Sequence, residues 1–298
     1  MDTYEEGGNS VTVQIGLTGW GDHPSLYADK VKQQNKLSEY ASHFPVVEVD
    51  TAFYAIQPVT HYQNWLKQTP ASFSFVIKAF QQLTGHDRES RSVQEARDLI
   101  KRYEESIQPV WEAGQVNALL FQFPPWFDVK KENIRKLRYI REWMEDYPIA
   151  LEFRNRTWFQ PSYREQTITF MKDQKWIHSI CDEPQAGEGS VPRVLIPTHP
   201  EKTLVRFHGR NIHGWNKNGR KDWREVRFLY RYNEEELTEW AGKIKELKKD
   251  TPEITMLFNN NSGGDAADNA KQMQEILNVH YEDLNPRQMD LFNFQEGT

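Results

Sequence analysis

The sequence predicts an α/β protein, a (β/α)₈ TIM-type barrel formed by a single domain. Short apolar segments alternate with helix-like segments, eight such apolar segments occur, and no Gly-, Ser- or Pro-rich linker divides the chain. Apolar strands that alternate with helices are typical of a parallel sheet covered by helices. Eight strands within 298 residues fit one closed barrel better than two smaller domains. An open doubly wound sheet is the alternative, because the order of strands along the chain does not show closure.

The predicted strands are the apolar runs that have the length of a strand. They comprise residues 13–17, 46–49, 73–78, 116–123, 149–153, 176–182, 204–208 and 254–259. The predicted helices comprise residues 36–43, 60–68, 92–111, 130–146, 162–172, 233–248 and 265–279. The sixth unit is irregular, since residues 183–202 contain Gly and Pro and have the pattern of a loop. We therefore expect a flexible N-terminus over residues 1–11, the barrel over 12–280 and a C-terminal tail over 281–298.

Composition limits the class of protein. The formal net charge of −6 argues against a protein that coats nucleic acid, although a local basic surface remains compatible with it. Cys181 is the only cysteine, which excludes an internal disulfide framework and suits a reducing compartment. The sequence contains no apolar segment of membrane-spanning length and no apolar signal region near Met1. We expect a cytoplasmic protein without membrane contact.

Most of the predicted strands end in a side chain that can bind or react. These side chains are Glu48, Asp50, Lys78, Gln122, Glu152, Arg154, Asp182, Arg206, His208 and Asn259. A structural core has no use for so many charges, because each unpaired buried charge costs several kcal/mol. In a closed barrel these groups would meet at the C-terminal ends of the strands, where such barrels hold their active sites. For any one residue, capping a strand or pairing with a neighbour is an equally good explanation.

The alternation of side chains along each strand supports an inward-facing set. In the fifth strand the bulky Ile149 and Leu151 share one face, and Glu152 lies on the other. We expect the bulky face to meet the helices and the polar strand ends to point into the barrel. On the sixth strand we expect Asp182 to point inward and Cys181 to point toward the helices as a small buried side chain.

Several short motifs carry a resemblance to a known family. They are VEVDTAFY at 47–54, FSFVIK at 73–78, LFQFPP at 120–125, LEFRN at 151–155, VRFHG at 205–209 and FNN at 258–260. In this order they resemble the YecE-like and YunF-like family of bacterial proteins, also called domain of unknown function 72. The resemblance covers roughly residues 13–279 and implies a TIM-type barrel with a polar pocket formed by the strand-end residues. It implies no particular reaction, and Asp50 stands where we expect the family to have Asn.

The acids of the predicted pocket allow two kinds of chemistry. Glu48 and Glu152 are candidates for general acid–base catalysis, whereas an ion-pair lattice that includes Arg154 is an equally good interpretation. Glu48, Glu152, Asp182 and His208 could also bind a divalent metal. No His-x-His or His-Glu-x-x-His spacing occurs, and the nearby cations weaken metal affinity, so a metal is not favoured and the cofactor stays open.

The bases of the predicted pocket point to an anionic ligand. Lys78, Arg154 and Arg206 can bind a phosphate or carboxylate, and the Gly-rich segment 259–265 leads into a helix N-terminus. The segment 206–231 is basic and contains interleaved aromatic residues that could stack on bases, although aromatic residues buried beneath a charged loop explain the pattern slightly better. Tyr54 and Trp158 are further candidates for contact with a sugar or base.

The tail contains a candidate partner-binding peptide. Gln288 to Phe292, with the sequence QMDLF, resembles the peptide by which bacterial replication and repair proteins bind the DNA sliding clamp. Leu291 and Phe292 would fill an apolar pocket, and Gln288 would form hydrogen bonds at its rim. The alternative is that the two apolar residues fold back onto the barrel.

The main hypothesis is a barrel enzyme that hydrolyses a phosphate-bearing ligand, a nucleotide or a DNA phosphoester. The predicted catalytic residues are Glu48, Glu152, Asp182 and His208. The predicted substrate-binding residues are Asp50, Tyr54, Lys78, Gln122, Arg154, Trp158, Arg206 and Asn259. A sugar isomerase or lyase that uses carboxylate acid–base catalysis is one alternative. A clamp-associated binding module without turnover is the other.

Overall fold

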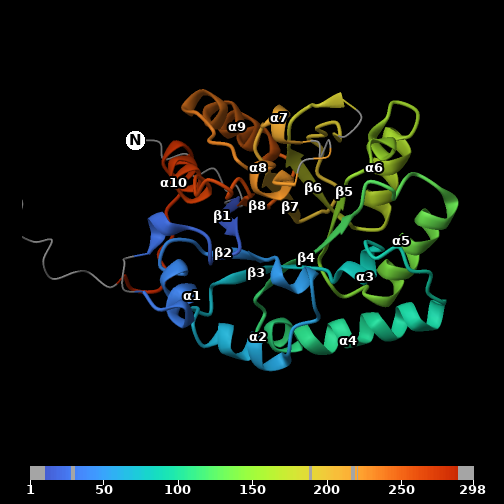
Figure 1. The fold of residues 1–298 in the computed structure, drawn as a ribbon, viewed down its shortest axis with the longest axis horizontal. Helices are drawn as coiled ribbons and strands as arrows, with labels where there is room; N and C mark the ends of the chain where they lie inside the picture. Colours follow the sequence, from blue (N-terminus) through green and yellow to red (C-terminus); the bar gives the residue numbers. More distant parts are fainter. Residues whose placement is uncertain (1–10, 28–30, 188–189, 216–218, 220, 288–298) are drawn as a thin grey trace, which may run out of the picture.

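A closed parallel barrel forms the centre of the molecule (Figure 1). The computed structural model describes residues 11–27, 31–187, 190–215, 219 and 221–287. Its strands are β1 (Thr12–Thr18), β2 (Val46–Val49), β3 (Ser74–Lys78), β4 (Val116–Phe123), β5 (Ile149–Phe153), β6 (Ile177–Asp182), β7 (Lys202–Phe207) and β8 (Glu253–Phe258). They pair in chain order, and β1 pairs with β8 to close the barrel. The predicted single-domain (β/α)₈ fold is confirmed.

Helices surround the barrel. The longer ones are α1 (Lys36–Tyr40), α2 (Val59–Leu66), α4 (Val93–Glu112), α5 (Lys131–Trp143), α6 (Arg164–Asp173), α9 (Glu234–Leu247) and α10 (Ala266–Leu277). Short helices α3 (Gln81–Thr84), α7 (Ile212–Trp215) and α8 (Trp223–Val226) lie in the connections. Within the described residues, no α-helix connects β6 to β7, which agrees with the predicted irregular sixth unit.

The start of α4 illustrates how local sequence positions a helix. The Ser92 side chain accepts a hydrogen bond from the Glu95 backbone N–H, and the Glu95 carboxylate accepts one from the Ser92 backbone N–H. This reciprocal cap satisfies two donors that the first helical turn would leave unpaired. Leu99, Ile100 and Tyr103 then bury one face of the helix.

The barrel interior has an apolar middle layer. It consists of Val46, Val76, Ala118, Leu120, Ala150, Ile177, Leu204 and Leu257. At Gly16 a Cβ atom would lie 2.0 Å from the Val46 carbonyl oxygen, so β1 can approach β2 only with glycine at this position. This layer fills the middle of the barrel. The next inward-facing residues, two positions further along the strands, are mostly polar and lie toward the C-terminal end of the barrel.

The side chains of β6 alternate in the opposite sense to the one predicted. Cys181 is in register with Arg206, which points into the barrel, and Asp182 is in register with Phe207, which packs on the α9 residue Trp240. Neighbouring residues in a parallel register share a face of the sheet. The expectation that Asp182 points inward and Cys181 outward is therefore wrong.

The physical reason is the size of the side chains in β6. Ile177 belongs to the interior layer, and Ser179 donates a hydrogen bond to the interior Glu152 carboxylate at 3.2 Å. Ile180 instead belongs to the core between barrel and helices. The small Ser179 and Cys181 thus face the interior on the same side as Ile177, and the bulkier Ile180 faces the helices.

The first part of the tail packs at the N-terminal end of the barrel. The Tyr281 hydroxyl accepts a hydrogen bond from the Ile15 backbone N–H at 2.8 Å. The Asn285 side chain donates to the Gln68 carbonyl oxygen at 2.7 Å, just beyond the end of α2. These contacts place residues 281–287 opposite the polar strand ends. Among the described helices, none is long and apolar enough to cross a membrane.

Candidate functional site

A charged cluster occupies the C-terminal end of the barrel. It comprises Glu48, Glu152, Arg154, Glu183, Arg206 and His208. At its centre the Arg206 side chain is 1% exposed. Its Nε and Nη2 atoms donate to the two Glu48 oxygens at 2.9 and 2.7 Å, and Nη1 donates to Glu152 at 2.6 Å. Arg206 therefore joins carboxylates from β2 and β5 across the barrel.

Arg154 extends the cluster to a residue that the sequence analysis missed. Its Nη1 donates to Glu183 Oε2 at 2.6 Å, and its Nη2 lies 2.8 Å from Glu152 Oε1. The Val191 backbone N–H donates to the other Glu183 oxygen at 2.6 Å. The predicted sixth strand ends at Asp182, and the next residue along the chain is also an acid. Glu183 takes the place in the cluster that was predicted for Asp182.

Asp182 forms its contacts on the helix side of β6. It accepts a hydrogen bond from Arg210 Nε at 2.8 Å and pairs with Arg193. Arg210 in turn donates to Glu236 of α9 at 3.1 Å. These contacts tie the sheet to the helix layer, so the structure does not bring Asp182 to the other predicted catalytic residues.

His208 is fully buried and neutral. Burial and the neighbouring Arg154 guanidinium hold the pKa of His208 well below its usual value. Its Nε2 lies 3.0 Å from Arg154 Nη2 and 3.5 Å from Glu152 Oε1, and its Nδ1 lies 2.9 Å from Asn259 Nδ2. The structure thus joins the predicted His208 and Asn259, and the ring is held on both sides.

Electrostatics keep Glu152 and Arg206 ionised at the centre of the cluster. Burial by itself raises the pKa of Glu152, but the charges of Arg154 and Arg206 outweigh burial and hold this pKa well below its usual value. Burial likewise opposes the charged form of Arg206, whereas Glu152 and Glu48 raise its pKa. A carboxylate bound in this way does not exchange protons near neutral pH. The geometry is the ion-pair lattice that the sequence analysis held open as the alternative to catalysis by Glu48 and Glu152.

Lys78 lies at the partly exposed mouth of this cluster. Its Nζ is 4.6 Å from the centre of the Phe53 ring, and within the described part of the chain it forms no ion pair shorter than 4.0 Å. Burial lowers the pKa of Lys78 to about 8; Glu48 opposes this shift, and Arg206 reinforces it.

Asp50 lies close enough to interact with Lys78. Burial raises the pKa of Asp50, the negative charge of Glu48 raises it further, and Lys78 partly offsets these effects. Asp50 and Lys78 are both partly exposed, as is Gln122, which is in register with Glu152 on the neighbouring strand. The mouth therefore combines an acid and an amine whose pKa values both move toward neutrality.

The loop after β7 packs against the charged cluster at the C-terminal end of the barrel. Trp215 is 2% exposed, and its ring centre is 6.4 Å from that of His208 and 5.7 Å from the Arg154 guanidinium. Arg227 lies 4.1 Å from the Trp215 ring centre and 4.8 Å from that of Trp223. Among the described parts of this loop, these aromatic rings pack against each other and against the cluster, as expected for aromatic residues beneath a charged loop.

Arg227 is a second cation without a carboxylate partner among the described residues. Burial, and then the charge of Arg154, lower the pKa of Arg227 to about 9. Two like charges held together in a low-dielectric environment favour an anion between them. Near α10, by contrast, Arg231 pairs with Asp265 at 2.9 Å, so the acid before this helix competes with any anion at its N-terminus.

The two aromatic residues predicted to contact a substrate, Tyr54 and Trp158, differ in exposure. The Trp158 ring is 1% exposed, stacks on Phe153 with ring centres 4.2 Å apart, and donates from Nε1 to the Phe127 carbonyl oxygen at 2.7 Å. It belongs to the core outside the barrel, which corrects its expected role as a substrate contact. Tyr54 is 65% exposed in the segment that follows β2.

The described residues do not assemble the predicted metal ligands. Asp182 faces the helices, which separates it from Glu48, Glu152 and His208. Ligand atoms of Glu152, Cys181 and His208 do lie within 4.8 Å of one another. Two guanidinium groups bind the same carboxylate, and their positive charge opposes a cation there.

The predicted clamp-binding residues Gln288, Leu291 and Phe292 lie outside the described residues. The described chain ends at Arg287, whose Nε donates to the Ser42 carbonyl oxygen at 3.2 Å.

The closed parallel barrel and the charged groups at its C-terminal end define a TIM-type barrel protein. The chain belongs to the family described as "Protein of unknown function DUF72", which matches residues 14–291. This finding confirms the family resemblance carried by the strand-end motifs.

Known relatives come from several bacteria. The chain is 54% identical to the UPF0759 protein YunF of Bacillus subtilis (strain 168) over 281 residues, which cover 94% of this chain and 100% of YunF. It is 23% identical to YecE of Escherichia coli (strain K12) over 216 residues, which cover 66% of this chain and 74% of YecE.

Solved structures of the family share the fold. A DUF72 protein of Enterococcus faecalis V583 (EF0366) superposes with a TM-score of 0.86 at 40% identity, over 94% of this chain and all of that one. A DUF72 protein of Thermotoga maritima MSB8 (TM1631) superposes with a TM-score of 0.77 at 27% identity, over 89% of this chain and 99% of that one.

Proposed function

We propose that the protein is a barrel enzyme of the isomerase or lyase class that transfers a proton on a small, phosphate-bearing, sugar-like substrate. Lys78 carries this proposal. It is a partly exposed amine at the C-terminal end of a barrel strand, and it forms no ion pair among the described residues. The carboxylates around it are occupied by Arg206 and Arg154.

The pKa values support Lys78 as the group that accepts the proton. With a pKa of about 8, a useful fraction of the amine is neutral near physiological pH. Asp50, whose pKa is raised by burial and by Glu48, retains a proton to donate more readily than an ordinary aspartate does. The two groups can thus remove a proton from one substrate atom and return it to another.

Arg227 and Arg154 support an anionic substrate. Arg154 uses its guanidinium for Glu152 and Glu183, whereas Arg227 lies over aromatic rings and forms no ion pair shorter than 4.0 Å with the described residues. A phosphate bound by Arg227 would relieve the repulsion that lowers the Arg227 pKa.

Hydrolysis of a phosphoester is the second candidate. The cations at the mouth favour it equally, because they would neutralise charge that develops on phosphate. Its predicted acids support it less well, since Glu48 and Glu152 are held by Arg206 and Asp182 faces the helices. A binding module without turnover is the remaining alternative.

Deuterium exchange into sugar phosphates distinguishes these functions. A panel of aldose and ketose phosphates is incubated with the protein in D₂O and followed by NMR. We expect the wild-type protein to exchange a carbon-bound hydrogen in one of them, and Lys78→Met to reduce the rate by about 10²–10⁴-fold. The Lys78 base acts when unprotonated, so the rate should rise with pH and level off above about 8.

Lys202→Met is the matched control, because this lysine pairs with Glu253 at the opposite end of the barrel. It should exchange at the wild-type rate. Equal exchange by Lys78→Met and wild type would exclude Lys78 as the base. Metal-dependent release of inorganic phosphate without exchange would establish the hydrolase instead, and phosphate-ester binding with neither reaction would establish the binding module.

A further inference from the structure

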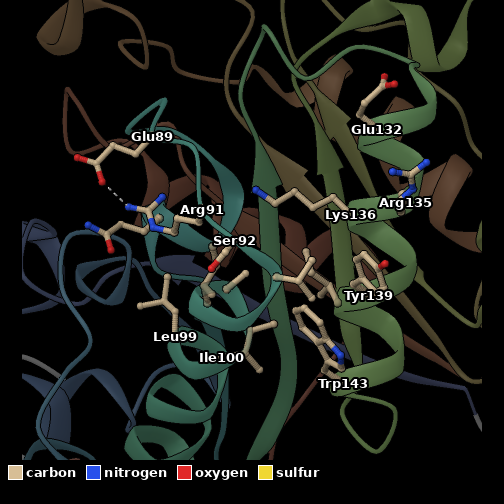
Figure 2. Close-up of a pocket in the computed structure, with 15 residues that line it drawn as sticks. Glu89, Arg91, Ser92, Leu99, Ile100, Glu132, Arg135, Lys136, Tyr139 and Trp143 are labelled. Carbon is tan, nitrogen blue, oxygen red and sulfur yellow. Dashed lines mark hydrogen bonds and ion pairs between the residues drawn. The ribbon is translucent and has the colours of Figure 1, made fainter.

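A cavity of about 290 Å³ lies outside the barrel, between α4 and α5 (Figure 2). The start of α4, one face of α5 and the segment from α3 to α4 enclose it. None of its lining residues belongs to the charged cluster. Its volume is near the lower end of the range for small-molecule pockets, about 300–1,000 Å³.

The walls of this cavity are largely apolar. Leu83, Leu99 and Ile100 line it from α3 and α4, and all three are buried. Tyr139 and Trp143 line it from α5 with nearly parallel rings whose centres are 5.3 Å apart. Figure 2 shows these two rings directed from α5 toward Leu99 and Ile100. The walls can therefore enclose an aromatic ring or a short hydrocarbon chain.

Lys136 places one cation in these apolar surroundings. Figure 2 shows its side chain extending from α5 across the gap, whereas Arg135 points away from α4. Within the described part of the chain, Lys136 forms no ion pair shorter than 4.0 Å. Burial lowers the pKa of Lys136 to about 8; the charge of Asp87 opposes this shift, and the charge of Arg91 reinforces it.

The other charged residues of the cavity leave room for one negative charge. Arg91 is already engaged, since it pairs with Asp87 and, at 2.8 Å, with Glu89. Glu89 and Glu132 also line the cavity and would repel a dianion such as a phosphate monoester. Arg135 also lines the cavity, but it is exposed and points away from α4, so a single carboxylate matches the ammonium of Lys136.

We propose that this cavity binds a small amphipathic monocarboxylate. Its carboxylate pairs with Lys136, and its apolar part lies between Leu99 and Ile100 on one side and the rings of Tyr139 and Trp143 on the other. Burial of the apolar part and pairing of the desolvated ammonium both favour binding. The site is independent of the chemistry proposed for the barrel mouth.

Calorimetry with 3-phenylpropionate and the uncharged 3-phenylpropanol tests the proposal. We expect the full-length protein to bind the acid about tenfold or more tightly than the alcohol, the difference expected for a charge-assisted hydrogen bond. Lys136→Met keeps the apolar stem and should remove this preference. Arg138→Met, an exposed residue of α5 that does not line the cavity, should preserve it.

Ala96→Leu provides a second variant, because Ala96 lines the cavity and a larger side chain would fill it. It should weaken binding of both probes. Thermal unfolding of each variant establishes that it is folded. Equal affinity of wild type and folded Lys136→Met for the acid would overturn the proposal, as would the absence of binding of both probes to the wild-type protein.

Discussion

Arg206 is the residue that holds the charged cluster together. Its guanidinium is 1% exposed and satisfies two carboxylates that are themselves fully buried. A buried ion pair of this kind adds little to stability compared with a well-packed apolar core, but the loss of one partner leaves the other charge buried and uncompensated. The intact cluster therefore adds little to the free energy of unfolding, but the replacement of any one of its charged residues should lower that free energy.

Replacement of Arg206 by Met should destabilise the fold by about 3–5 kcal/mol, because Glu48 and Glu152 would lose their shared partner. Arg206→Lys should have a smaller effect, since it retains the charge but loses the two-pronged contact with Glu48. Denaturant unfolding measures both changes. Lys249→Met, which breaks an exposed pair with Glu246, should leave the unfolding midpoint unchanged. A midpoint for Arg206→Met equal to that of wild type would contradict the role of Arg206.

Strand β6 shows how one element decides which polar residues reach the site. Ile177 fills the interior layer, so Ser179 and Cys181 share its face, and Asp182 faces the helices. Burial, and then the negative charge of Glu152, raise the pKa of the Cys181 thiol. The single cysteine therefore reports on the charged cluster, whereas Asp182 does not contact it.

Thiol reactivity can test this orientation. Glu152→Gln removes the negative charge nearest Cys181, so it should lower the pKa of the thiol and speed its reaction with a small disulfide reagent. Asp182→Asn should leave that rate unchanged but reduce stability by about 2 kcal/mol, because Arg193 and Arg210 lose a buried acceptor. Both rates are measured under conditions where each variant is folded. Equal acceleration by both substitutions would show that Asp182 also faces the barrel interior.

At the scale of the whole molecule, the charged cluster and residues 281–287 lie at opposite ends of the barrel. Tyr281 and Asn285 form hydrogen bonds with the N-terminal end of the barrel, away from the cluster. Residues 288–292 follow directly after the described part of the chain. We propose that this segment binds the DNA sliding clamp, as its sequence suggests.

A pull-down of purified bacterial sliding clamp should retain the full-length protein and lose the double variant Leu291→Ala and Phe292→Ala. These two side chains supply the apolar contacts of the peptide. Asn293→Ala, immediately after the motif, is the control and should bind as wild type does. Undiminished binding of the double variant would exclude the tail as a clamp ligand.

The sequence by itself determined the eight strands and most of the polar strand ends, whereas the pairing of β1 with β8 that closes the barrel came from the structure. Apolar runs and their spacing have a local physical cause, the alternation of side chains along a buried strand. Glu48, Glu152, Arg154, Arg206, His208 and Asn259 were all predicted for the pocket, and the structure brings them into contact. The candidate site could therefore be located before its geometry was known.

Only the tertiary structure decided which of these groups remain available for chemistry. Glu48 and Glu152 had the pattern of catalytic acids, yet Arg206 engages both from a strand more than 50 residues away. Glu183 joined the cluster and Asp182 left it, because the size of Ile177 and Ile180 fixes which side chains of β6 fit the interior. Lys78 remains unpaired among the described residues. Packing between distant strands determines which charges meet, and the local order of residues does not reveal this packing.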